Sequence, residues 1–104
     1  MDERIKKLQS YLEQSPNDCF LNHALALEYI KIGKDEEARG QFEKNRAYDA
    51  NYVATYYHLA KLLERMGDED EAIKVYEQGM VVAKEQGDTH SFSELRSAYE
   101  ELTF

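Results

Sequence analysis

Apolar residues recur at helical spacing through much of the chain, most clearly between residues 51 and 79. Residues three or four positions apart share one face of a helix. The first such set in this stretch is Tyr56, Leu59, Ala60, Leu63 and Met66. The second is Ala72, Ile73, Val75, Tyr76 and Met80. Two amphipathic helices with a short break between them predict an antiparallel helix hairpin.

The break between these helices has the composition of a tight turn. Gly67 can take the left-handed conformation that closes a helix end at little cost. Asp68 is a suitable N-cap, and Glu71 stands three residues later, as in a capping box. We therefore predict a positive φ at Gly67 and at Gly33, which occupies the same place one hairpin earlier.

The whole hairpin pattern occurs twice, with an interval of 34 residues. The repeated residues are those at which two packed helices must touch. Leu25, Ala26, Gly33, Glu37, Ala38, Phe42 and Glu43 precede Leu59, Ala60, Gly67, Glu71, Ala72, Tyr76 and Glu77 by this interval. A fixed period of this kind indicates stacked helical repeats.

Helical patterns also flank the two hairpins. A first helix is expected in residues 2–14, with Ile5, Leu8, Tyr11 and Leu12 on one face and Pro16 after its end. A last helix, with Phe92, Leu95, Ala98, Tyr99 and Leu102 on one side, is expected after a capping box at Ser91 and Glu94. We predict one domain over residues 1–104, made of an N-terminal helix in 1–16, a first repeat in 17–50, a second repeat in 51–86 and a capping helix in 87–104.

This repeat resembles the tetratricopeptide repeat, whose signature is W-x2-L-G-x2-Y, then A-x3-F, then P. The first copy has Asn22-x2-Leu25-Ala26-x2-Tyr29 and Ala38-x3-Phe42, and the second has Tyr56-x2-Leu59-Ala60-x2-Leu63 and Ala72-x3-Tyr76. Asn22 and Leu63 depart from the signature aromatics, and Ala50 and Lys84 replace its proline. Without a proline at Lys84 the helix there should run on. The resemblance implies an all-α, right-handed α-solenoid of antiparallel helix hairpins with about six helices.

In this family the first helix of each repeat lines a concave groove that binds extended or helical peptide segments of protein partners. The resemblance assigns to this groove Phe20, His23, Leu27, Ile30 and Lys31 from the first repeat, and Ala54, Tyr57, Lys61, Glu64 and Arg65 from the second, with His58 nearby. The clamp that some members use for a C-terminal carboxylate is incomplete, because Leu27 stands where an asparagine is expected. Lys31, Lys61 and Arg65 are expected to make the groove locally basic, which suits a peptide with acidic groups or a free carboxylate.

Composition narrows the classes of partner. The net charge of −8 argues against nucleic acid and anionic membranes, which both attract basic surfaces. No apolar run approaches the length of a membrane span, and the N-terminus lacks the apolar segment of a signal peptide. The single cysteine excludes an internal disulfide. Together these features favour the cytoplasm.

Specific catalytic or metal-binding motifs are missing from the sequence. Neither His23 nor His58 has a histidine or cysteine at the spacing that places two ligands on one helix face. Cys19 begins a helix and is interpreted as a partly buried structural residue. We therefore expect a protein-interaction module with no cofactor and no catalysis. The alternative is a structural module that forms homodimers or larger oligomers through an exposed end, because two hairpins are fewer than repeat stacks usually need; light scattering would separate the two.

Overall fold

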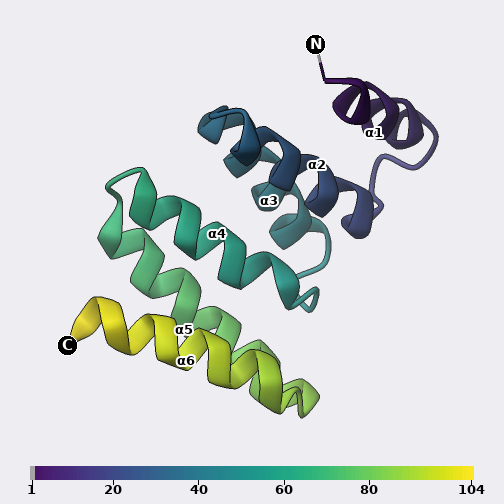
Figure 1. Cartoon of the computed structure of the whole chain (residues 1–104). Coiled ribbons are helices and arrows are strands. Elements are labelled where there is room, and N and C mark those ends of the chain that lie inside the picture. Colours follow the sequence, from purple (N-terminus) through teal and green to yellow (C-terminus); the bar gives the residue numbers. More distant parts are fainter. Residues whose placement is uncertain (1) are drawn as a thin grey trace. The chain divides into compact units, whose positions relative to one another are not determined.

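The computed structural model describes residues 2–104, and every regular element within them is an α-helix (Figure 1). The helices are α1 (Glu3–Gln14), α2 (Cys19–Lys31), α3 (Asp35–Tyr48), α4 (Ala54–Arg65), α5 (Glu69–Gln86) and α6 (Thr89–Thr103). The predicted all-α fold with about six helices is confirmed. None of the helices in residues 2–104 combines the length and apolar character that crossing a membrane requires.

The chain folds as two compact units that meet in the sequence between Tyr52 and Val53. The first unit contains α1, α2 and α3, and the second contains α4, α5 and α6. Each unit holds one helix hairpin and one additional helix packed against it.

In the first unit, α2 and α3 form the hairpin and α1 packs against α2. Ile5 and Leu8 from α1 join Leu25 from α2 in a buried cluster, and Leu12 packs against this cluster. Tyr11 was expected to join them, but it is 52% exposed. Tyr11 lies three positions after Leu8 and directly before Leu12, which places it at the edge of the apolar face, where its ring remains in water.

In the second unit, α4 and α5 form the hairpin, and α6 packs against α5 and over a smaller area against α4. Tyr76 and Val75 from α5 are completely buried, as are Leu59 and Ala60 from α4. Leu95 is the main apolar residue that α6 adds to this core. Gly79 is also buried, and a Cβ added to it would lie only 2.6 Å from Cβ of Tyr56. Helices α4 and α5 therefore approach each other closely at this glycine.

Both hairpin turns close as the sequence predicts. Gly33 has φ of 76° and Gly67 has φ of 87°, which is the left-handed conformation that glycine adopts most easily. The next residue in each turn donates its backbone N–H back into the helix, from Lys34 to the Tyr29 carbonyl and from Asp68 to the Leu63 carbonyl, both at 2.9 Å. These bonds satisfy carbonyls that a helix end would otherwise leave unpaired.

The start of α6 differs from the prediction. Asp88, not Ser91, is the N-cap: its carboxylate accepts hydrogen bonds from the backbone N–H of Ser91 at 3.0 Å and from the Ser91 hydroxyl at 2.8 Å. These two bonds lower the pKa of Asp88, because they favour its ionised form. Helix α5 does run on past Lys84, as expected without a proline there, and ends at Gln86 before Gly87.

Candidate functional site

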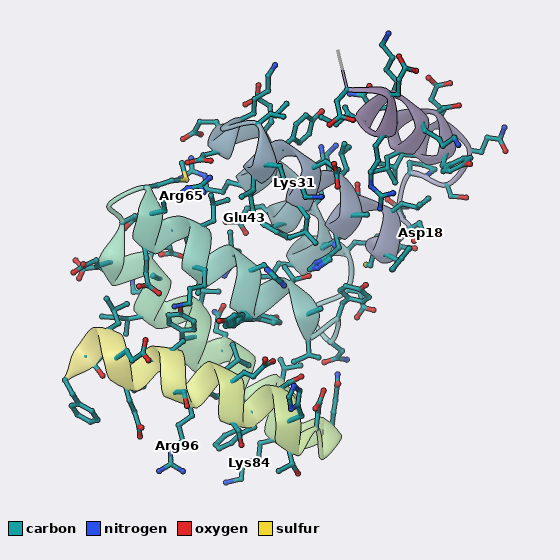
Figure 2. All side chains as sticks on the ribbon, in the orientation of Figure 1. Asp18, Lys31, Glu43, Arg65, Lys84 and Arg96 are labelled. Atoms are coloured by element: carbon teal, nitrogen blue, oxygen red, sulfur yellow. The ribbon has the colours of Figure 1, made fainter. Side chains whose placement is uncertain are left out.

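A surface hollow of about 350 Å³ lies between α4 and α6 in the second unit. It is lined by Tyr57 and Lys61 from α4 and by His90, Ser93, Glu94, Ser97, Ala98 and Glu101 from α6. Tyr57 and Lys61 belong to the predicted groove residues, and the α6 residues do not. Figure 2 shows the side chains of both helices.

Lys61 is held within its own helix. Its Nζ lies 5.9 Å from the centroid of the Tyr57 ring, within the range of a cation–π contact, and 3.9 Å from Oε2 of Glu64. Glu64 in turn accepts a hydrogen bond from the hydroxyl of Tyr76 on α5. Burial, and then this bond to a carboxylate, raises the pKa of Tyr76. Glu64, predicted as a groove residue, thus links α4 to α5 and also lies close to Lys61.

The α6 wall of the hollow is acidic. Glu94 and Glu101 stand seven residues apart, on one face of the helix, with Ser97 and Ala98 between them. Nε2 of His90 lies 3.6 Å from Oε2 of Glu94, a contact that is ionic only when His90 is protonated. The lining therefore holds one lysine and two glutamates, in contrast to the basic surface expected from α2 and α4 alone.

The remaining predicted residues of α4 do not line the hollow. His58 is partly buried, with its ring 5.5 Å from that of Tyr57. Burial lowers the pKa of His58, and Glu94 opposes that shift. Ala54 and Arg65 are the first and last residues of α4 and are exposed.

The five predicted residues of the first unit all lie on α2, in different environments. Phe20 is 68% exposed, whereas Leu27 and Ile30 are partly buried. The His23 ring packs edge-on against Phe42, with centroids 5.6 Å apart, and against Tyr52 at 6.1 Å.

Lys31, the predicted cation of the first unit, pairs with a carboxylate on its own helix. Its Nζ lies 3.0 Å from Oε2 of Glu28, and Nε of Arg4 on α1 approaches the same oxygen to 3.1 Å. The Glu28 side chain is only 7% exposed. A buried carboxylate requires such partners, so Lys31 and Arg4 both compensate the charge of Glu28, and Arg4 links α1 to α2. Figure 2 labels Lys31 on α2.

Other reactive groups are in structural settings. Burial, followed by the charges of Asp49 and Asp18, raises the pKa of the Cys19 thiol, so Cys19 is not an activated nucleophile. Within residues 2–104, no group of three or more histidine, cysteine, aspartate or glutamate side chains is arranged to hold a metal ion.

The residues on α6 escaped the sequence prediction because it took the groove only from the first helices of the two repeats. Shifting Lys61 by 34 residues leads to Leu95, which is buried, so the repeat period does not locate the α6 wall. A different signal was present. His90, Glu94, Ser97 and Glu101 recur at spacings of four, three and four, which forms a polar stripe on one face of α6.

Comparison with protein families finds a match to the tetratricopeptide repeat over residues 53–80. The comparison with curated proteins finds no match. Among solved structures, a tetratricopeptide repeat domain protein from Salinibacter ruber is 42% identical, with 83% of this chain and 96% of that one covered and a TM-score of 0.79.

Two more distant structures share the fold. Protein BPP2914 from Bordetella parapertussis is 23% identical, with 99% of this chain and 90% of that one covered and a TM-score of 0.84. PcrH, solved in complex with the chaperone binding region of PopD, is 19% identical, with 95% and 75% covered and a TM-score of 0.87. The six helices, the repeated Gly turns and the similarity to the Salinibacter ruber domain agree, and the chain belongs to the tetratricopeptide repeat family.

Proposed function

We propose that this chain is a non-catalytic protein-interaction module that binds a peptide segment of a partner protein in the hollow between α4 and α6. The observation that carries the proposal is the hollow itself. It combines an aromatic ring, two serine hydroxyls and charged groups of both signs on the surfaces of two packed helices. Pockets with an apolar wall and a few polar groups are typical of binding sites.

A bound peptide can be recognised only through the side chains of these two helices. Their backbone groups are already paired within the helices, so a bound segment cannot add to them as a strand would. Tyr57 offers a flat apolar surface, and Ser93 and Ser97 offer short hydrogen-bonding groups. PcrH supports this mode of action by fold, since it was solved with a segment of its partner PopD.

Of the predicted groove residues, only those of α4 enter this proposal. Tyr57 and Lys61 are proposed to contact the peptide directly, with Glu64 beside Lys61. The face of α2 that carries Phe20 remains a prediction from the family resemblance.

A peptide selection would test this function and requires no identified partner. We would select random twelve-residue peptides displayed on phage against the immobilised protein and measure the affinity of the selected peptides by fluorescence anisotropy. Ser97 lines the hollow and is exposed, so Ser97→Tyr should fill the hollow without disturbing the core. We expect this variant to lose most of the affinity.

The matched control is Ser10→Tyr, which places the same ring on the exposed side of α1 in the other unit. It should bind the selected peptides like the parent chain. The proposal is wrong if no peptide is enriched, or if the selected peptides bind Ser97→Tyr as tightly as Ser10→Tyr.

A further inference from the structure

The charged groups of the hollow differ in whether they are already paired. Lys61 has Glu64 and the Tyr57 ring as partners. Glu101 forms no ion pair within the described residues. Glu94 has two histidines near it, His90 at 3.6 Å and the partly buried His58, and either one offsets its charge only when protonated. The charge that the hollow can still offer to a ligand is therefore negative.

We propose that the partner segment inserts the side chain of an arginine or lysine into this hollow; the inference rests on the peptide-binding function proposed above. The cation would lie against the α6 wall, between Glu94 and Glu101. These two residues are separated by about 10 Å along the helix at 1.5 Å per residue, which leaves room for one cationic group between their flexible side chains.

The small residues between the two glutamates suit such a side chain. Ser97 and Ala98 are small, so a long side chain can approach α6 between the two carboxylates. The aliphatic part of arginine or lysine can cover Ala98 while its charged end reaches a carboxylate. Arginine fits best, because its planar guanidinium can bind a carboxylate through two parallel hydrogen bonds.

An acidic segment would be disfavoured in this hollow. Its carboxylate would lie near Glu94 and Glu101, and the nearby cation, Lys61, is already paired with Glu64. Like charges placed together at an interface disfavour binding. We therefore expect a basic segment in this hollow, whereas the family resemblance led to the expectation of an acidic one.

The test uses three pools of nonapeptides labelled with fluorescein. The central residue is arginine, glutamine or glutamate, and the other positions carry an equal mixture of alanine, leucine and serine. We expect the arginine pool to bind the parent chain about twofold to fivefold more tightly than the glutamine pool, and the glutamate pool most weakly. The preference should shrink as salt increases, because salt screens exposed charges.

Two double variants assign the preference to the hollow. Glu94→Gln with Glu101→Gln should bind the arginine and glutamine pools equally while keeping the affinity of the parent for the glutamine pool. Glu69→Gln with Glu85→Gln removes the same charge from exposed positions on α5 and should keep the preference for arginine.

The outcomes distinguish failure of the basic-ligand inference from failure of the proposed peptide binding. A glutamine or glutamate pool that binds most tightly, and loses its affinity in Ser97→Tyr, would overturn the basic ligand and leave peptide binding in place. An arginine preference that survives Glu94→Gln with Glu101→Gln would also overturn the inference. If no pool binds, or if binding is unaffected by Ser97→Tyr, both the inference and the proposed function are wrong.

Discussion

Equivalent residues of the two repeats occupy their cores in different ways. Asn22 and Tyr56 are 34 positions apart, as are Asn45 and Gly79, and all four are buried. In the first unit the two asparagines donate hydrogen bonds, to the Pro16 carbonyl at 3.3 Å and to the Cys19 carbonyl at 2.9 Å. In the second unit the large Tyr56 side chain packs against Gly79, which has no side chain. The first unit thus uses these positions for hydrogen bonds, and the second uses them for close packing of Tyr56 against Gly79.

This packing predicts opposite effects for two glycine substitutions. Gly79→Ala places a methyl group against Tyr56 and 3.1 Å from Cδ1 of Leu95, and should destabilise the chain by about 1–3 kcal/mol. Gly40 lies within α3, is exposed and has nothing within 4 Å of an added Cβ. Gly40→Ala should stabilise by about 0.5–1 kcal/mol, because alanine favours helix. Urea unfolding measures both, and a stabilising Gly79→Ala would contradict the close contact of α4 with α5.

Three glycines show how far the role of a single residue can be predicted from the sequence. Gly33 and Gly67 were predicted correctly, because a helix ends at each of them and glycine is the residue that accepts the local conformation. The requirement at Gly79 could not be predicted, since it comes from Tyr56 and Leu95 on two other helices. The backbone conformation at a helix end can be predicted from one stretch of sequence, whereas contacts between helices cannot.

Helix boundaries can be predicted only in part from the sequence. Asp68 was predicted as a cap, and its carboxylate accepts a hydrogen bond from the backbone N–H of Glu71 at 3.3 Å. At α6, however, Asp88 and Ser91 are both good capping residues, and the sequence suggested the wrong one. The choice between them is decided by where α5 ends, at Gln86 with Gly87 as its cap, because the next helix begins directly afterwards.

The revised cap makes a prediction about α6. Asp88→Ala removes the acceptor for the Ser91 backbone N–H and should lower the urea midpoint. Ser91→Ala keeps that bond and removes only the hydroxyl donor, so its effect should be clearly smaller. A larger loss for Ser91→Ala would restore Ser91 as the cap.

For the molecule as a whole, the 34-residue period predicted the two hairpins and not the division into two units. The period describes what the repeats share, and α6 belongs to neither full repeat. Its contact with α4 therefore had no counterpart in the pattern, and the acidic wall of the hollow was missed with it.

Helix α6 should be essential to the second unit. Leu95 and Ala98 are buried, and Leu95 lies next to Gly79 on α5. Deleting residues 88–104 would expose the apolar face of α5 to water, so we expect aggregation or loss of cooperative unfolding. Circular dichroism melting and light scattering on the shortened chain would measure this. A soluble shortened chain that melts at the temperature of the parent would show that α6 is dispensable.

The most direct test of the central claim, that a peptide binds between α4 and α6, is NMR with a spin-labelled peptide obtained from the selection. We predict that the label broadens the amide signals of Tyr57, Lys61, Ser93 and Ser97 most strongly, with little effect on exposed residues of α1 such as Ser10. Broadening centred on any other part of the chain, with the α4 and α6 signals unchanged, would contradict the claim.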